Sequence, residues 1–297
     1  MKPADFALLC AVCLMWALNL IVTRWMVTEG GVPPFFFAAV RVGLLAAVLS
    51  PFLFPAPRQI GLTFLIAMGL GAFQFGLMFA GLVTAGAGVA GVIGQLGVPF
   101  TTILSVMLLG ERIGLYRGAG IVMSFAGVMI IVFDPGGFSF TIGVLYLTLA
   151  AFVGSIANIL MKHIDPMPAM RLQGWVGLFS FPPLLAMSLL TETGQGDAYL
   201  SGDWRVYAAS VFAVAGVSVF AHGNFYRLLK RYEVTLVSPL TLMTPVLSVI
   251  LGVILLGEPL TIRLVIGAAI AIAGVAVIGM RPNRRFPEAA VGDKIGQ

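Results

Sequence analysis

Long apolar runs separated by short polar connections fill almost the whole chain. A helix needs about 20 apolar residues to cross the hydrocarbon core of a bilayer, and the runs are close to this length. They lie at 4–26, 33–54, 60–83, 88–109, 116–133, 141–161, 170–190, 206–229, 234–256 and 260–280. Even the longest connection, 191–205, is too short to form a soluble domain. The pattern predicts an all-α integral membrane protein with ten transmembrane helices.

The composition points to the same class. Apolar residues make up 60% of the chain, charged residues make up 10%, and the mean hydropathy is +1.05. Soluble domains typically have about 45–50% apolar and about 25% charged residues. A soluble globular fold is therefore excluded, and the lipid bilayer is the expected surrounding.

The basic residues predict the orientation of the chain in the membrane. Short cytoplasmic loops are enriched in lysine and arginine. If the N-terminus lies in the cytoplasm, all but four of the 17 basic residues lie on that side, the exceptions being Arg24, Arg41, Arg205 and Arg263. We therefore expect both termini in the cytoplasm. This topology also accounts for the net charge of +5, so no nucleic-acid partner is expected.

The chain contains an internal repeat with an offset of 147 residues. LLGERIGLYRGAGIVMSFAGV (108–128) matches LLGEPLTIRLVIGAAIAIAGV (255–275) at 8 of 21 positions. The matches include Gly110 with Gly257, Glu111 with Glu258, Gly120 with Gly267 and Gly127 with Gly274. The predicted units are a first five-helix repeat (1–135), a second five-helix repeat (136–281) and a cytoplasmic tail (282–297). Because five is odd, the second repeat must cross the membrane in the opposite sense, which makes an inverted repeat.

These features resemble a known family. In both copies, glycines follow the LLGE glutamate after nine and 16 residues, and each copy has an asparagine, Asn19 or Asn158, on its first helix. The chain thereby resembles the EamA type of the drug/metabolite transporter superfamily and is similar to its aromatic amino acid exporter branch. The resemblance implies a secondary transporter of the bacterial inner membrane that exports amino acids, including aromatic ones, or related metabolites. Inverted repeats suit such transporters, because two equivalent halves can open one midplane site alternately to either side.

Ionisable residues are scarce inside the predicted helices. All 12 aspartates and glutamates fall at helix ends or in loops, which disfavours a proton relay built on a buried carboxylate. His222 is left as the deep group that titrates near neutral pH. We therefore favour facilitated diffusion, with proton exchange linked to His222 as the alternative.

Polar and aromatic residues on the predicted helices are the candidates for substrate binding, because polar groups are costly in a membrane. Trp16 and Asn19 share one face of the first helix, and the repeat sets His222 and Tyr226 opposite an aromatic pair on the third helix. The substrate-binding candidates are Trp16, Asn19, Phe79, Gln95, Asn158, Trp175, His222, Tyr226 and Thr241. Interhelical hydrogen bonding and ordinary aromatic packing are the competing interpretations.

Arg41 lies seven residues inside the second helix, which corresponds to a depth of about 10 Å. It could attract a substrate carboxylate. Outward snorkelling, or pairing with Glu29 or a backbone carbonyl, is the favoured interpretation. Glu111 and Glu258 are expected to shape helix ends or to bond to loop groups, with gating as a second role.

A stripe of glycines marks the fourth helix. Glycines recur there every three residues, and the repeat sets them opposite hydroxyl residues on the ninth helix; the pairs are Gly88 with Thr235, Gly91 with Ser238, Gly94 with Thr241 and Gly97 with Thr244. We expect the glycines to share one face, because small residues let helices approach closely or leave space for a substrate. Gating or packing roles are predicted for Gly91, Gly94, Pro99, Ser238 and Pro245.

Other classes of function fit less well. An intramembrane enzyme needs a nucleophile with its base, an aspartate pair or a metal cluster, and the sequence assembles none of these. Cys10 and Cys13 form a CxxC without further ligands nearby, so no metal or cofactor is expected. A channel needs polar rings that these apolar helices do not supply. A sugar-phosphate or nucleotide-sugar carrier is the runner-up, but few buried basic residues are available to hold phosphates. The expected partner is a small-molecule substrate, and the expected working unit is a monomer.

Overall fold

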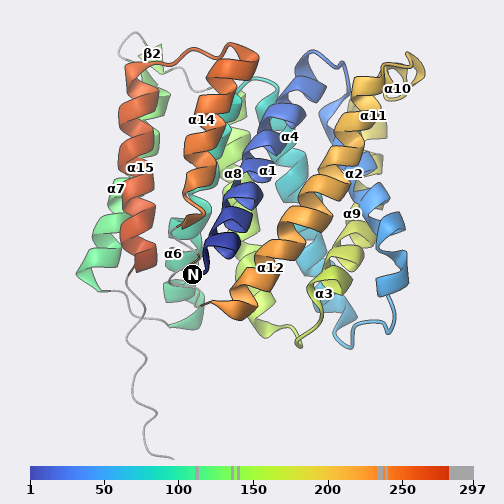
Figure 1. Cartoon of the computed structure of the whole chain (residues 1–297), viewed down its shortest axis with the longest axis horizontal. Coiled ribbons are helices and arrows are strands. Elements are labelled where there is room, and N and C mark those ends of the chain that lie inside the picture. The colour runs from blue at the N-terminus through green and yellow to red at the C-terminus, as the bar shows by residue number, and fades with distance from the viewer. Residues whose placement is uncertain (111–113, 135–136, 139–140, 233–236, 238–239, 281–297) are drawn as a thin grey trace, which may run out of the picture.

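Apolar helices run side by side along the height of the molecule (Figure 1). The computed structural model describes residues 1–110, 114–134, 137–138, 141–232, 237 and 240–280. The α-helices are α1 (Pro3–Thr28), α2 (Pro34–Val48), α3 (Ile60–Ala67), α4 (Gln74–Leu82), α5 (Ala87–Gly94), α6 (Gly97–Leu109), α7 (Leu115–Val132), α8 (Ile142–Leu160), α9 (Ala169–Thr191), α10 (Asp197–Leu200), α11 (Trp204–Val211), α12 (His222–Arg231), α14 (Met243–Leu256) and α15 (Ile262–Met280). Short 3-10 helices are η1 (Ser50–Phe52) and η3 (Met161–His163), and π-helical segments are η2 (Met68–Phe73) and η4 (Phe212–Ala221). Strands β1 (Phe133–Asp134) and β2 (Gly137–Phe138) pair antiparallel, with Phe133 opposite Phe138 and Asp134 opposite Gly137.

Among the described residues, seven helical runs are long and apolar enough to cross a bilayer. They are Pro3–Thr28, Ile60–Leu82, Ala87–Leu108, Ile142–His163, Ala169–Thr191, Trp204–Leu229 and Ile262–Gly279. Three shorter apolar helices, Pro34–Val48, Leu115–Ile131 and Met243–Leu256, coincide with parts of the second, fifth and ninth predicted spans to within one residue. Every predicted span thus contains an apolar helix, and seven of these reach spanning length.

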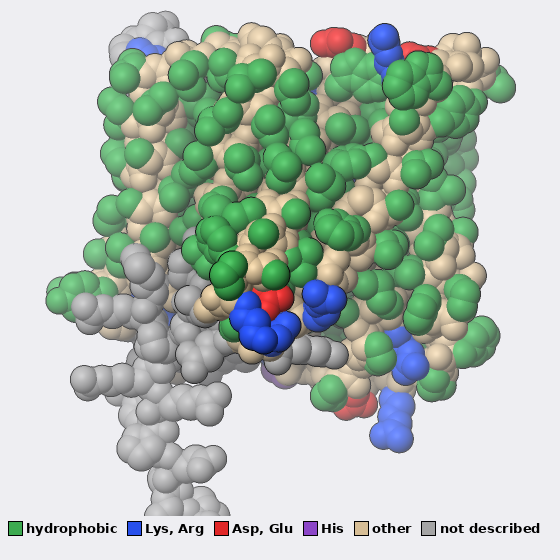
Figure 2. Space-filling model, in the orientation of Figure 1, with side chains coloured by type: hydrophobic (Ala, Val, Ile, Leu, Met, Phe, Trp, Pro, Cys, Tyr) green, Lys and Arg blue, Asp and Glu red, His purple; other side chains and the backbone are tan. Residues whose placement is uncertain are grey.

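The two ends of the bundle differ. The N-terminus lies at the lower end in Figure 1, which we call the N-terminal face. The connections that follow α1, α4 and α14 lie at the upper end, which we call the distal face. On the side seen in Figure 2, apolar side chains cover the middle of the molecule, and Lys, Arg, Asp and Glu side chains gather at the two ends. A belt without charges between charged ends is the surface that a bilayer requires.

The two LLGE sequences end their helices in the same way. Gly110 follows α6 and Gly257 follows α14, with φ angles of 66° and 63°. These angles lie in the left-handed region, which glycine adopts without the steric cost of a Cβ, and a glycine there commonly ends a helix. The repeated motif therefore encodes a repeated helix stop.

Glycines let α7 and α15 pack backbone against backbone. A Cβ at Gly120 would lie 2.7 Å from the carbonyl oxygen of Gly274, and a Cβ at Gly127 would lie 2.5 Å from that of Gly267. Either distance is too short for any other residue, so the close approach depends on the missing side chains. All four are the glycines that the LLGE repeat aligns.

Both π-helical segments interrupt the helices that carry the aromatic candidates. The run from α3 to α4 contains η2, and the run from α11 to α12 contains η4. A π turn widens the helix and shifts the side chains that follow it, and it is frequent at functional sites. The segments come directly before the turns that hold Phe75 and His222.

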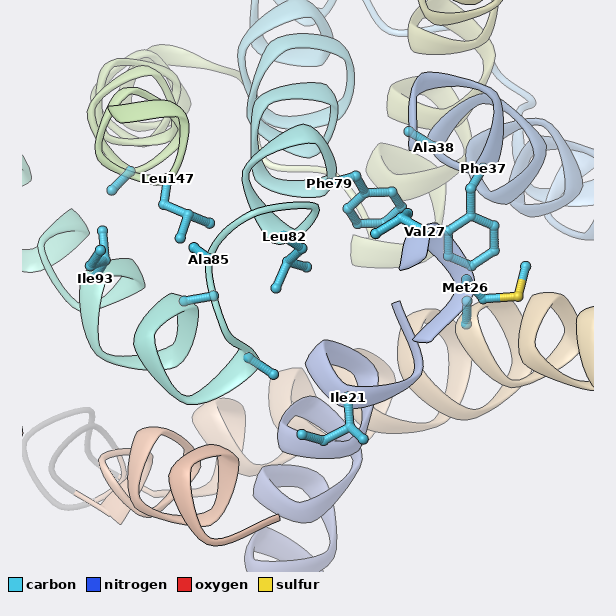
Figure 3. Packing of buried hydrophobic residues seen from close by; sticks show 14 of the residues in the cluster. Ile21, Met26, Val27, Phe37, Ala38, Phe79, Leu82, Ala85, Ile93 and Leu147 are labelled. Carbon is cyan, nitrogen blue, oxygen red and sulfur yellow. The ribbon is translucent and has the colours of Figure 1, made fainter. Parts of the chain in front are cut away.

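The main apolar core lies toward the distal face. Figure 3 shows Phe37 of α2 and Phe79 of α4 turned toward each other, and Leu147 of α8 directed toward the start of α5. The rings of Phe37 and Phe79 stack with centroids 5.3 Å apart, and both are fully buried. This core fixes α2 against α4 and so sets the position of the polar residues one turn deeper.

Candidate functional site

Asn19 and Arg41 form a buried polar pair between α1 and α2. Nη1 of Arg41 donates a hydrogen bond of 3.0 Å to Oδ1 of Asn19. Only 7% of Asn19 and 2% of Arg41 is exposed. An interhelical hydrogen bond, one of the two roles expected for Asn19, is therefore present.

The guanidinium of Arg41 lies against aromatic rings. Its Cζ is 4.8 Å from the ring centroid of Phe75 and 5.9 Å from that of Phe79. The favoured prediction for Arg41 is wrong, because the side chain is buried rather than snorkelled outward, while Glu29 is exposed at the end of α1. Turning inward gives the cation an amide acceptor and two π faces in a region where lipid offers neither.

His222 follows the π-helical segment η4. Its Nδ1 lies 2.8 Å from the carbonyl oxygen of Val217, five residues earlier, a spacing that the wider π turn provides. A carbonyl only accepts, so Nδ1 donates this hydrogen bond, and in the neutral imidazole Nε2 is then an acceptor. The imidazole centroid lies 5.4 Å from the Trp16 ring and 6.5 Å from the Tyr226 ring, and Trp16 also meets Phe225 at 5.0 Å.

These side chains form one group, which we call the polar–aromatic cluster. Its members are Trp16, Asn19, Arg41, Phe75, Phe79, His222, Phe225 and Tyr226. They come from α1, α2, α4 and α12, and Trp16 and Asn19, three residues apart on α1, link the residues around His222 to those around Arg41. Two N–H donors of the cluster, Trp16 Nε1 and Arg41 Nε, are buried without a hydrogen-bond partner in the described part of the chain. Buried donors normally find acceptors, so these two are available to hydrogen-bond a bound molecule.

Two predicted residues lie apart from the cluster. Trp175 of α9 donates from Nε1 to the carbonyl oxygen of Leu53, directly after η1, at 3.1 Å. Asn158 is exposed on α8 and has no hydrogen-bond partner among the described residues. The repeat aligns Asn158 with Asn19 and Trp175 with Arg41. Because the second copy has a tryptophan at the arginine position, Asn158 lacks the guanidinium that bonds to Asn19.

The predicted fourth helix is broken in the middle, between α5 and α6. Gln95 lies half-buried in the turn at the break. A Cβ at Gly91 would collide with Ser248 of α14, whereas a Cβ at Gly94 would meet nothing within 4 Å. A step of three residues falls short of a 3.6-residue turn, so each step rotates the stripe by about 60°. The expectation that these glycines share one face is therefore wrong, because Gly91 packs against α14 and Gly94 borders open space.

The prolines and hydroxyl residues of the stripe lie near helix starts. Pro99 is the third residue of α6 and Pro245 is the third residue of α14, and both are buried. Proline fits the first turn of a helix because its missing N–H has no partner to lose there. Thr241 lies half-buried in the turn before α14, and Ser238 lies outside the described residues.

Charged side chains join the elements of the distal face. Glu258, in the connection between α14 and α15, accepts hydrogen bonds from the backbone N–H groups of Ala87 and Gly88, which begin α5. Arg24 of α1 donates to the carbonyl oxygens of Leu82 and Ala85, and its Nε lies 3.9 Å from Glu258 Oε1. We call this group the distal clamp. The prediction that Glu258 bonds to helix-end groups is confirmed, whereas Glu111 lies outside the described residues.

A second carboxylate ties α9 to α2 at the same face. Glu192 accepts hydrogen bonds from the backbone N–H groups of Phe35 at 2.8 Å and Phe36 at 3.0 Å. A negative charge at a helix N-terminus satisfies unpaired N–H groups and complements the helix dipole. Both carboxylates therefore have structural partners at the distal face.

Within the described ranges, the histidines, cysteines and acidic residues do not gather into a group of three or more that could hold a metal ion. Cys10 and Cys13 are free thiols on α1, half-buried and buried respectively.

Known proteins share both the sequence and the fold. The profile of the EamA-like transporter family matches residues 5–133 and again residues 141–280. The chain belongs to the EamA-like transporter family. The resemblance predicted from the LLGE motifs is thereby confirmed, and this EamA-like protein is a multi-pass membrane transporter and not an enzyme.

Two relatives of this transporter carry the name "probable amino-acid metabolite efflux pump". The protein from Salmonella typhimurium is 30% identical, over 96% of this chain and 98% of its own length. The protein from Escherichia coli K12 is 27% identical, over 95% of this chain and 97% of its own length. A crystal structure with 22% identity matches the transporter with a TM-score of 0.60, over 93% of this chain and 96% of that chain, and supports the fold alone.

Some residues of the site in this EamA-like transporter were not among the sequence candidates. Phe75 and Phe225 enter the cluster through ring contacts with Arg41 and Trp16. Phe75 belongs to the aromatic pair that the repeat sets opposite His222 and Tyr226, whereas the sequence near Phe225 holds no comparable signal. The depth of Arg41 in the second helix does not identify its partner, Asn19.

Proposed function

We propose that this EamA-like transporter exports small metabolites, with amino acids including aromatic ones as the first substrates, from the cytoplasm by alternating access. The observation that carries the proposal is the polar–aromatic cluster, which joins Arg41 and Asn19 to Trp16 and His222 in the interior of an apolar bundle. Polar groups inside a membrane are costly and usually serve a substrate path. The cluster combines hydrogen-bond donors with aromatic faces, as a zwitterion with an apolar side chain requires.

The proposed architecture is ten transmembrane helices in two inverted repeats, 1–135 and 136–281. The contacts of α7 with α15 support it. The offset of 147 residues relates Gly120 to Gly267 and Gly127 to Gly274. The contact of Gly120 with Gly274 in one pair is therefore equivalent to the contact of Gly267 with Gly127 in the other. A two-fold axis between the helices produces this exchange. The two matches to the family profile and the two LLGE helix stops support the same arrangement.

Alternating access needs the distal side to open and close. The distal clamp joins Arg24 and α5 of the first repeat to Glu258 of the second. We infer that the arrangement described here is closed at the distal face, and that release of Glu258 from α5 accompanies opening. With both termini in the cytoplasm of a bacterial cell, the distal face is the outer face of the inner membrane. The cluster lies within one chain, so a monomer suffices.

The names of the relatives support the substrate class, and the cluster fits the runner-up less well. A sugar phosphate or nucleotide sugar carries two or more negative charges, and in the described residues of the cluster Arg41 is the one cation. An amino acid brings a single carboxylate.

Uptake into liposomes tests the proposal. Labelled phenylalanine, threonine or methionine should enter vesicles that contain the purified protein faster than protein-free vesicles, while glucose 6-phosphate should not. If none of the three amino acids moves faster, the amino acid proposal fails. An equal initial rate with and without a pH gradient favours facilitated diffusion, whereas a gradient dependence that His222→Gln removes favours proton exchange.

A further inference from the structure

Arg41 is a buried cation that has no carboxylate partner among the described residues. The carboxylates that the structure places in contacts lie elsewhere: Glu192, Glu258 and Asp203 bind backbone N–H groups at helix N-termini, and Asp5 pairs with Arg231 at the N-terminal face. Arg41 instead bonds to a neutral amide. An isolated charge in a low-dielectric interior is expensive unless an opposite charge compensates it.

The donors around Arg41 outnumber the acceptors. A guanidinium has five N–H donors, and in the described structure one hydrogen bond, to Asn19, is formed. Nε is buried without a partner, and so is Nε1 of Trp16, three residues before Asn19 on α1. The rings of Phe75 and Phe79 cover a face of the guanidinium, which leaves its donor edge for a ligand. The site therefore lacks negatively charged acceptor atoms.

We propose that Arg41 and Asn19 form a binding site for the carboxylate group of the transported molecule. The carboxylate accepts from the guanidinium edge of Arg41, including Nε, and neutralises its charge. Asn19 holds the guanidinium in place through its Oδ1. The adjoining rings of Trp16, Phe225 and Tyr226 are left to surround the rest of the molecule. This inference rests on the proposed function and narrows it to substrates with one carboxylate.

The fork of donors on arginine selects among anions. Two parallel N–H groups match the two oxygens of a carboxylate, and such charge-assisted pairs are stronger than neutral hydrogen bonds. A carboxamide of the same shape presents one acceptor oxygen and no charge. A carboxylic acid and its amide therefore differ mainly in the group that we expect Arg41 to bind.

Asn19→Asp gives the sharpest variant, because it adds a carboxylate where Arg41 already bonds. The side chain keeps its size, and the 3.0 Å contact becomes an internal ion pair. The variant should fold at least as stably as the wild type, since it supplies the missing counter-ion. It should lose the carboxylate site, since the guanidinium is then neutralised within the protein. Arg41→Gln removes the cation itself, and Arg58→Gln, at an exposed loop position, is the matched control.

Binding to the purified full-length protein is measured by thermal unfolding with phenylalanine, threonine, methionine and phenylacetate, each beside its amide. The wild type and Arg58→Gln should bind each acid at least about tenfold more tightly than its amide, which is the ratio of affinities expected from a charge-assisted hydrogen-bonded pair. In Asn19→Asp and Arg41→Gln this preference should fall to within about twofold, with the unfolding temperature of Asn19→Asp unchanged or raised.

Two results would overturn the inference: the wild type binds no acid more tightly than its amide, or Asn19→Asp keeps the preference. The same acid and amide pairs, followed in liposomes, separate this inference from the proposed function. Transport of acids and amides alike, unaffected by Asn19→Asp, removes the carboxylate site and leaves the transporter. Selective binding that Asn19→Asp abolishes, without transport of any amino acid, keeps the site and removes the proposed amino acid export.

Discussion

Glu258 Oε2 accepts a hydrogen bond of 3.1 Å from the backbone N–H of Gly88. A side chain from the second half of the chain therefore caps α5, a helix in the first half of the chain. Oε1 of the same carboxylate accepts from Ala87 at 2.6 Å. Both bonds go to N–H groups in the first turn of α5, which have no partner within the helix. The position of α5 therefore depends on a residue far away in the sequence.

Glu258→Gln should lower the stability of the distal face. The amide keeps one acceptor oxygen but loses the charge that complements the α5 dipole and Arg24. The loss of these two interactions should lower the free energy of unfolding by about 1–2 kcal/mol. Thermal unfolding of the purified protein measures the loss. Glu29→Gln, at an exposed residue of the same face, should leave the unfolding temperature within error. Equal behaviour of the two variants would contradict the role given to the clamp.

The contact of α7 with α15 predicts a contrast between two glycines of one helix. Gly127→Ala should destabilise the protein by about 2 kcal/mol or more, because its Cβ meets the backbone of Gly267 and Ala271, which cannot move aside. Gly118→Ala has nothing within 4 Å of its Cβ and should be neutral or stabilising by up to about 1 kcal/mol, the gain in helix propensity. Chemical or thermal unfolding of both variants checks the pair, and a similar loss in each would argue against the glycine contact.

The broken fourth helix predicts a second contrast, between Gly91 and Gly94. Gly91→Leu should disrupt the contact of α5 with α14, because Ser248 fills the space, and should lower both expression and transport. Gly91→Ala combined with Ser248→Gly should recover stability relative to Gly91→Ala alone. Gly94→Leu should fold normally, since its Cβ meets open space, but should slow transport if that space carries the substrate. Normal transport by a well-expressed Gly94→Leu would place the substrate path elsewhere.

The predicted orientation is tested with single cysteines in a background in which Cys10 and Cys13 are replaced by alanine. A cysteine at Ser201, in the connection between α10 and α11, should react with a membrane-impermeant maleimide added to intact cells. A cysteine at Arg58 should react only after the inner membrane is opened. Both original residues are exposed, so accessibility within the protein does not limit either reaction. The reverse labelling pattern would invert the proposed topology.

The elements of the fold follow from local sequence patterns. Apolar runs of membrane length predict the helices. The glycine of each LLGE sequence predicts a helix end, because helices commonly end at a residue in the left-handed conformation and glycine adopts this conformation most easily. The break between α5 and α6 was not predicted, since hydropathy does not distinguish one helix from two that follow each other in a straight line. The glycine spacing does indicate that the stripe cannot face a single neighbour, because residues that recur every three positions do not stay on one face of an α-helix.

The site could be predicted only in part, because its contacts are made between distant helices. The sequence singles out Asn19 as a polar residue in an apolar helix, but its bond to Arg41 depends on how α1 crosses α2. Repeat symmetry was the best guide available, and it failed where the two copies differ in chemistry. Asn158 and Trp175 occupy the positions of Asn19 and Arg41, yet an indole cannot replace a guanidinium, so the second copy builds no equivalent pair.

Counterflow tests the central claim most directly, because it distinguishes a carrier with one alternating site from a channel or a leak. Liposomes containing the purified protein are loaded with unlabelled phenylalanine and diluted into a trace of labelled phenylalanine. The account predicts a transient accumulation of label above its equilibrium level, absent in protein-free vesicles and reduced in Trp16→Ala. Label that enters loaded and empty vesicles at the same rate and never exceeds equilibrium would contradict alternating access around the polar–aromatic cluster.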